Sequence, residues 1–335
     1  MMTPAIRALH AHGNGRHITL LTSPSGAGVA QLVPEINDVL LYEAPWVKST
    51  EPRADSHPDH AIISQLRAGR FDAAVIFTTF SQSPLPAALL CHLAGIPLRL
   101  AHCREQVYGL LTDRVPDPEP EQGIRHEVRR QLDLVATVGA RTANEHLSLR
   151  VPDHVQAGMR DNLRELGLDT RRPWAVLHPG STAASRRYPP ELFADVTRTL
   201  VARHGWQIVV TGSDSERGLA QDIAACAGVA VYDLTGHLDL AELVAVIADA
   251  PVILTNNTGP SHIAAAVGTP VVCLYALTNP QHTPWLVPSR VLSQDVPCRW
   301  CFRSVCPEGH HACLRGVPPE AVVTAALELG AARPG

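Results

Sequence analysis

Short apolar runs alternate with amphipathic stretches along the whole chain. Runs such as 73–77 (AAVIF) and 207–211 (QIVVT) are typical of strands buried on both faces of a parallel sheet, and the stretches between runs repeat apolar residues at helical spacing. The predicted strands are 17–22, 39–42, 73–77, 98–101, 175–178, 207–211, 229–232, 252–255 and 271–275. The predicted helices are 27–33, 61–68, 85–93, 124–138, 191–204, 215–227, 240–248, 261–267 and 318–329.

This alternation predicts an α/β fold in which a doubly wound parallel sheet occurs twice. A chain of 335 residues has room for two domains of roughly 150 residues each. The connector 169–173 (DTRRP) directly precedes a new strand. We therefore place the first domain at 1–160 and the second at 161–335, with the last helix free to cross back to the first domain.

Composition narrows the class of protein. Hydrophobic residues make up 45% and charged residues 18%, which excludes a disordered chain, and the net charge of -4 gives no basic excess for nucleic acid. No apolar run approaches a membrane span, and the N-terminus lacks the pattern of a targeting segment. We expect a cytoplasmic protein with reduced thiols. Because Lys48 is the only lysine, anions must be bound by Arg, His or backbone N–H groups.

Three loops after predicted strands of the second half are rich in small and polar residues. They are 177–187 (LHPGSTAASRR), 211–216 (TGSDSE) and 255–262 (TNNTGPSH). Ligands bind at the carboxyl ends of parallel strands, where N–H groups and helix N-termini favour anions. The loops therefore predict a site for a phosphate-bearing ligand. Neither GxGxxG nor GxxxxGK[ST] occurs at these turns, which disfavours the standard dinucleotide and P-loop sites.

The motifs HPGSTAASRRYPPELFADV, TGSDSERGLAQDIA and NNTGPSHIAAAVGTPVVCLYALTNP resemble glycosyltransferase family 9, known best for ADP-heptose:lipopolysaccharide heptosyltransferases. The resemblance covers essentially the whole chain. It implies a GT-B architecture of two Rossmann-like domains facing a cleft, with the acceptor on the N-terminal domain and the nucleotide sugar on the C-terminal one. It also implies an ADP-heptose donor, a lipid-linked glycan acceptor in lipopolysaccharide-core synthesis, and transient contact with the inner membrane face.

The resemblance assigns a catalytic role to Arg186, which stands where heptosyltransferases place a lysine and would stabilise the leaving phosphate. No metal is required for this step, and no DxD pair follows a strand. Glu216 stands where the family has an acidic residue near the nucleoside. The residues expected to bind the donor are Pro179, Gly180, Ser181, Arg187, Thr211, Gly212, Ser213, Glu216, Asn257, Thr258, Gly259, Pro260, Ser261 and His262.

The chain departs from the family pattern in two ways. Family members begin with a strand and a Gly-Asp turn that carries the candidate general base, whereas this chain opens at MMTPAIRAL, inside the following helix. We therefore expect the base upstream of Met1, the first strand of the N-terminal domain to be missing, and its neighbours to have unpaired edges. A misassigned start and a loss of activity both explain this. The second departure is Asn257, where heptosyltransferases commonly carry Asp.

These departures keep two alternatives open: a non-catalytic protein that binds nucleotide sugars, and a nucleotide-sugar epimerase of the same architecture. A separate feature is the segment 298–313 (CRWCFRSVCPEGHHAC), which brings Cys298, Cys301, Cys306 and Cys313 together. CxxC spacing is compatible with a metal site of four thiolates, or of three thiolates and one imidazole from His310 or His311. Structural zinc, reduced or redox-labile thiols, and an iron–sulfur site are the three interpretations.

Overall fold

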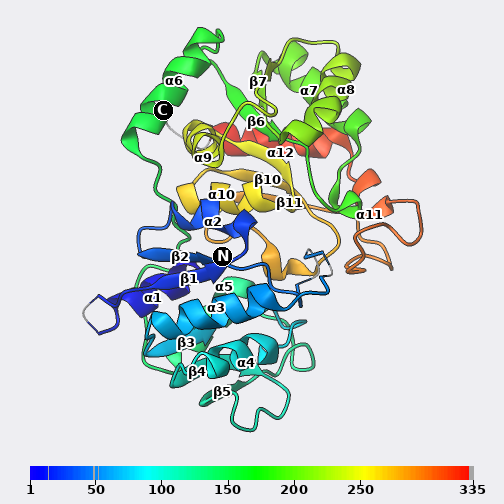
Figure 1. Ribbon diagram of the computed structural model, residues 1–335. Coiled ribbons are helices and arrows are strands. Elements are labelled where there is room, and N and C mark those ends of the chain that lie inside the picture. Colours follow the sequence, from blue (N-terminus) through cyan, green and yellow to red (C-terminus); the bar gives the residue numbers. More distant parts are fainter. Residues whose placement is uncertain (14, 48–49, 52, 332–335) are drawn as a thin grey trace. The chain divides into compact units, whose positions relative to one another are not determined.

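The computed structural model describes residues 1–13, 15–47, 50–51 and 53–331, so Lys48 lies outside the described residues. The chain divides into two compact units, Met1–Glu145 and His146–Gly335, each of which is a parallel α/β structure (Figure 1). The division falls earlier than the expected boundary at residue 160. The reason is helix α6 (Asp153–Glu165), which is attached to the second unit. Arg160 forms two 2.8 Å bonds to Asp249, and Gln156 donates to the carbonyl of Ala245.

The second unit contains one six-stranded sheet in the order β11-β10-β9-β6-β7-β8, and every pair is parallel. The strands are β6 (Trp174–His178), β7 (Gln207–Val210), β8 (Tyr232–Asp233), β9 (Ile253–Asn256), β10 (Val271–Leu274) and β11 (Ser289–Leu292). The chain builds outward from β6 in one direction and then returns to place β9 on its other side. The strand order therefore reverses between β6 and β9, the position at which open α/β sheets bind ligands.

Helices cover both faces of this sheet. Helices α7 (Pro190–His204), α8 (Arg217–Ala227) and α12 (Pro319–Ala331) pack on one face. Helices α9 (Leu240–Asp249) and α10 (Gly259–Val267) pack against each other, and α6 packs against α9. These helices cover the opposite face of the sheet, which carries the other half of the alternating strand side chains. Because α12 contributes Val322 and Ala326 to the core of the second unit, this last helix belongs to that unit.

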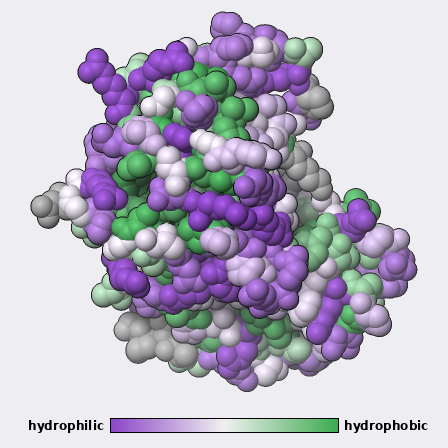
Figure 2. Space-filling model, turned by 90° about the horizontal axis from the view of Figure 1, so that it is seen from below, coloured by the Kyte–Doolittle hydropathy of each residue, from purple (hydrophilic) through white to green (hydrophobic). Residues whose placement is uncertain are grey.

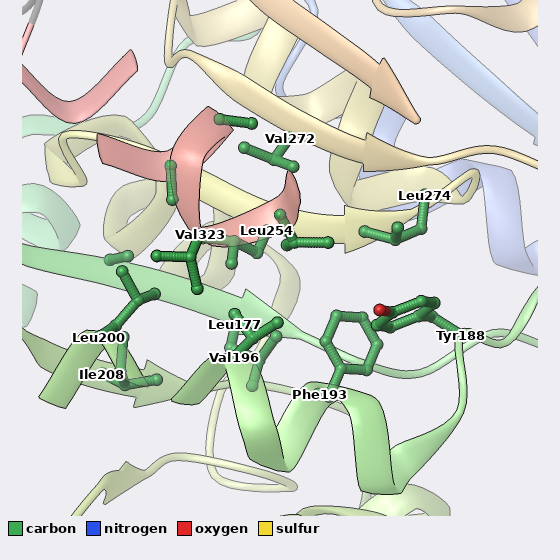
Figure 3. Packing of buried hydrophobic residues seen from close by; sticks show 14 of the residues in the cluster. Leu177, Tyr188, Phe193, Val196, Leu200, Ile208, Leu254, Val272, Leu274 and Val323 are labelled. Atoms are coloured by element: carbon green, nitrogen blue, oxygen red, sulfur yellow. The ribbon is translucent and has the colours of Figure 1, made fainter. Parts of the chain in front are cut away.

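The core under α7 is built from large apolar side chains that meet across the strands. Phe193 and Leu200 of α7 lie over Leu177 and Ile208 of the sheet (Figure 3). The ring of Tyr188 packs edge-on against Phe193 at 4.9 Å between centroids, and its hydroxyl donates to the carbonyl of Val317 at 2.7 Å. The segment that leads into α7 is thus fixed by both packing and a buried hydrogen bond.

The first unit has two separate pieces of parallel sheet. One pairs β1 (Thr19–Thr22) with β2 (Asp38–Leu41), and the other has the order β3 (Ala73–Ile76), β4 (Leu98–Cys103), β5 (Asp113–Pro116). Both pieces contribute to one apolar core. Among the described residues, β1 pairs only with β2, and β3 only with β4. The two pieces are therefore not hydrogen-bonded to each other as strands in the described part of the chain, and the missing first strand stays a prediction.

The helices of the first unit follow the predicted order. They are α1 (Thr3–Ala11), α2 (Pro24–Ala30), α3 (His57–Ala68), α4 (Leu85–Leu93) and α5 (Glu127–Ala136). Among the described residues no helix is long and apolar enough to cross a bilayer. Figure 2 shows hydrophobic patches separated by hydrophilic side chains on one face of the molecule.

We expect Phe193→Ala to lower the free energy of unfolding of the second unit by about 3–5 kcal/mol, because the substitution leaves a cavity among fully buried side chains. Urea denaturation followed by fluorescence measures the shift. Leu166→Ala, at a side chain that is 47% exposed, is the control and should change stability by less than about 0.5 kcal/mol. Equal effects of the two variants would contradict this account of the core.

Candidate functional site

Asn256 joins the ends of two neighbouring strands at the reversal point of the second sheet. It is the last residue of β9 and is completely buried. Its Nδ2 donates to the carbonyl of Pro179 at 2.7 Å, and its Oδ1 accepts from the N–H of Tyr188 at 2.9 Å. One amide therefore holds both ends of the loop that follows β6, residues 179–187, which we call the β6 loop. The sequence analysis missed this role, although it selected the neighbouring Asn257.

Arg186 is the half-buried cation of the β6 loop. It ends the short 3-10 turn η1 (Ala184–Arg186) and lies near Cys273 of strand β10 and Tyr275, the residue that follows this strand. Within the described part of the chain, its buried Nε has no hydrogen-bond partner and its guanidinium forms no ion pair. Burial lowers the pKa of this guanidinium. A cation that is desolvated without a counter-ion is costly to bury, and a phosphate would supply the missing acceptors.

Arg187, the other arginine of the loop, is different. Its side chain is exposed, and its Nε donates to the carbonyl of Ser181 at 2.7 Å. The two adjacent arginines, which the sequence could not distinguish, are thus separated by the structure. One cation is directed into the protein without a partner, and the other stabilises the loop from outside.

Glu216 links the β6 loop to the loop after β7, residues 211–216, which we call the β7 loop. Its Oε2 accepts from the N–H of Ser213 at 2.8 Å and from the Ser213 hydroxyl at 2.9 Å. A Cβ added to Gly180 would lie only 1.9 Å from Oε1 of this carboxylate, and one added to Gly212 would lie 3.2 Å from Oε2. Gly180 therefore leaves the space that the carboxylate occupies, whereas a Cβ at Gly212 would be a tight contact that a small shift relieves.

His178 is a site residue that the sequence analysis did not select. It ends β6, is buried, and its Nδ1 is 3.0 Å from the hydroxyl of Thr211. Burial lowers the pKa of His178 to about 4, against the opposing charge of Glu216. The imidazole is therefore neutral near pH 7 and acts as a hydrogen-bonding group under the β6 and β7 loops.

The third predicted loop, residues 257–262 or the β9 loop, runs into α10. Thr258 is the N-cap residue of this helix, and its carbonyl accepts from the Ser261 hydroxyl at 2.7 Å. The positive end of the helix dipole lies at this position. The remaining residues here are the exposed Gly259, the buried Pro260 and the half-buried His262.

Asn257 is bonded to the segment that follows β10. Its Nδ2 donates to the carbonyl of Ala276 at 3.3 Å and to the hydroxyl of Thr278 at 3.1 Å. A carboxylate could not donate to the Ala276 carbonyl, so the neutral amide suits this position locally. The three loops follow β6, β7 and β9, which are direct neighbours in the sheet. The structure therefore places the predicted donor-site segments along one edge of the second unit.

The four clustered cysteines are brought together in the segment 298–313, which we call the Cys-rich segment. They line a cavity of about 20 Å³ with His310 and His311, and Cys298 Sγ lies 3.9 Å from His310 Nε2. Burial and the neighbouring thiols raise the pKa of Cys313. In the described ranges, no three His, Cys, Asp or Glu side chains are arranged to hold a metal ion. All four thiols are free, and zinc stays a prediction.

The first unit has its own polar cluster at the carboxyl ends of β3, β4 and β5, which the sequence analysis also missed. Arg130, completely buried, binds both carboxylate oxygens of Asp117 at 2.7 and 3.0 Å. Beside it, Glu127 and Gln131 of α5 are hydrogen-bonded to each other. The second carboxylate oxygen of Glu127 and the amide oxygen of Gln131 have no hydrogen-bond partner among the described residues. Glu127 and Gln131 are both buried, at 2% and 0% exposed.

Comparisons with known proteins identify the family of this chain. The profile of glycosyltransferase family 9 (heptosyltransferase) matches residues 60–312, and the chain belongs to this family. Lipopolysaccharide heptosyltransferase 2 of Escherichia coli K12 is 29% identical over 269 residues, which cover 77% of this chain and 75% of that protein. The corresponding enzyme of Salmonella typhimurium is 28% identical over the same shares.

Solved structures show the same fold. A family 9 glycosyltransferase from Veillonella parvula matches with a TM-score of 0.80 at 19% identity, covering 99% of this chain and 93% of that one. The ADP-heptose lipopolysaccharide heptosyltransferase II of E. coli matches at 0.73 and 24% identity, covering 98% and 94%. An E. coli heptosyltransferase solved with ADP matches at 0.68 and 18% identity, covering 98% and 95%. The chain is a glycosyltransferase of the GT-B fold class, and not one of the epimerases considered from architecture alone.

The buried His178 predicts a loss of stability in acid. In the unfolded chain this histidine titrates near 6.5, so between pH 6.5 and 4 the unfolded state binds a proton that the folded state excludes. The free energy of unfolding is therefore at its full value above pH 6.5, and protonation of His178 in the unfolded state lowers it by up to about 3 kcal/mol as the pH approaches 4. The urea midpoint of His178→Gln should fall less than that of the parent protein between pH 7.5 and 4.5. Parallel pH profiles would contradict the assignment.

The zinc hypothesis predicts about one zinc per chain in protein purified without chelators. Mass spectrometry of the metal content measures it, and the variant Cys298→Ser/Cys301→Ser should lose the metal. A metal content below about a tenth of an equivalent would reject a structural metal site at the Cys-rich segment.

Proposed function

We propose that this chain transfers a sugar, with heptose favoured, from a nucleoside diphosphate to an acceptor in the lipopolysaccharide core or a related surface glycan. The observation that carries the proposal is the half-buried, unpartnered guanidinium of Arg186 at the reversal point of the second sheet. The names of the E. coli and Salmonella relatives support the acceptor class. The relatives solved as ADP-heptose enzymes or with ADP support the donor.

The chemistry follows from charge. When the bond between the anomeric carbon and the diphosphate breaks, negative charge develops on the leaving phosphate. The guanidinium of Arg186 offers two parallel N–H groups to phosphate oxygens, and the N-terminus of α10 supplies a dipole of the same sign. The proposed step assigns this charge to Arg186 and α10 and to no metal ion. Glu216 lies against Gly180 and Gly212, and its carboxylate is available to accept hydrogen bonds from the hydroxyl groups of the nucleoside ribose.

On the acceptor side, the proposal uses the carboxyl ends of β3, β4 and β5 in the first unit. It assigns no individual acceptor-binding residue there, because the side chains of Glu127 and Gln131 are buried. No general base is assigned among the described residues.

A second candidate function is binding of a nucleotide sugar without transfer. The observation that favours it is Asn257, a neutral side chain whose amide is bonded to Ala276 and Thr278 where heptosyltransferases commonly carry Asp. Calorimetric binding of ADP with no detectable transfer from ADP-heptose would support this function. Any measurable transfer to a lipopolysaccharide-core acceptor would exclude it.

We expect Arg186→Ala to lower kcat/KM for ADP-heptose by about 100-fold or more, because the substitution removes the cation that faces the leaving phosphate. Arg186→Lys should be intermediate, since a lysine keeps the charge and loses the bidentate geometry. Transfer kinetics with a lipopolysaccharide-core acceptor measure kcat/KM, and calorimetry with ADP measures the affinity for the nucleotide.

The matched control is Arg203→Ala. Arg203 is exposed in the last turn of α7, so this variant removes the same charge away from the β6 loop. It should retain the parent kinetics. If Arg186→Ala behaved like the control, the site assignment would be wrong.

A further inference from the structure

Ser185 connects the phosphate-facing turn to the Cys-rich segment. It directly precedes Arg186 in η1 and is only 5% exposed. Its N–H donates to the carbonyl of Ser304 at 3.0 Å, and its hydroxyl donates to the carbonyl of Arg303 at 2.6 Å. Two consecutive carbonyls, more than a hundred residues away in sequence, thus hold one serine by both of its donors.

The Cys-rich segment is itself attached at a second place. The N–H of Phe302 donates to the carbonyl of Leu277 at 2.9 Å, in the segment that follows β10. The side chains of Phe302, Arg303 and Ser304 are exposed. Backbone hydrogen bonds attach these residues to Ser185 and Leu277. The small thiol-lined cavity also has Ser185 and Leu277 in its wall.

Arg186 needs such external support. Apart from the bonds of Ser185, the backbone of this turn has only local bonds, from the Arg186 N–H to the carbonyl of Ala183 and from the Arg187 N–H to the carbonyl of Ala184. The guanidinium has no partner in the described part of the chain that would fix its direction. Because a half-buried cation without a counter-ion is better solvated outside, an unsupported turn would release Arg186 toward water.

We propose that Ser185 is a positioning residue for the transfer reaction, which holds Arg186 toward the donor phosphate through the carbonyls of Arg303 and Ser304. This inference rests on the proposed function. It also gives the Cys-rich segment a role at the donor site as the fixed support of the β6 loop. Ser185 itself contacts neither donor nor acceptor in this proposal.

The test compares Ser185→Val with Ser185→Thr. Both variants add the same branched side chain, and only threonine retains the hydroxyl that donates to Arg303, so the packing cost cancels in the comparison. Loss of one buried hydrogen bond predicts that Ser185→Val has a KM for ADP-heptose about 3- to 10-fold above that of Ser185→Thr. Melting temperatures report whether both variants are folded. Equal KM values in two folded variants would overturn the proposal.

The double-mutant cycle separates positioning from general stability. If Ser185 acts through Arg186, valine and threonine at position 185 must give the same kinetics in the Arg186→Ala background. A difference that persists without the guanidinium would overturn the proposal, because Ser185 would then act by another route.

A readout without nucleotide keeps this inference distinguishable from the proposed function. Phenylglyoxal modifies accessible guanidinium groups, and mass spectrometry locates the modified arginine. Arg186 should react faster in Ser185→Val than in Ser185→Thr, and Arg203 should react equally in both. If the parent protein neither bound ADP nor transferred a sugar, the proposed function would fail, while equal rates at Arg186 would separately reject the positioning role.

Discussion

The candidate site depends on one buried side chain, Asn256, at the point where the strand order of the second sheet reverses. Strands β6 and β9 are neighbours, but the chain continues from β6 to one side of the sheet and from β9 to the other. The loops that follow these two strands therefore lie side by side. Backbone groups in such loops lie over a buried core and require hydrogen-bond partners. The amide of Asn256 supplies both, since its Nδ2 donates to the Pro179 carbonyl and its Oδ1 accepts from the Tyr188 N–H. The loop that carries Arg186 is therefore held at both ends by a neighbouring strand.

A fixed loop permits an arrangement that is unfavourable by itself. Burying the guanidinium of Arg186 without a counter-ion costs free energy. The buried position persists only if the surrounding structure prevents the turn from opening. Asn256 secures the loop ends, and Ser185 secures its middle through the Cys-rich segment. In the proposed function, these contacts keep a cation ready for a phosphate. Preorganisation of this kind is what electrostatic catalysis requires.

Local sequence patterns predicted most strands and helices because the buried parallel strands are short apolar runs. The predictions failed where strands are exposed. Strands β5 and β11 carry polar or charged residues and lie at sheet edges, so no apolar run marks them. Strand β8 was expected at 229–232 and contains only Tyr232 and Asp233. Helix α6 was missed, and with it the unit boundary, because only Met159 and Leu163 of this helix are buried.

By itself the sequence determined the fold class, the family and the three loops of the candidate site, since each depends on residues that are close together in the chain. Tertiary structure alone decided which of two adjacent residues does what. Arg186 differs from Arg187, and Asn256 from Asn257, only in the direction of each side chain. That direction is set by contacts with residues far away in sequence, such as Ser304 for the turn and Pro179 for the amide. No local pattern contains that information, because it arises when distant strands become neighbours.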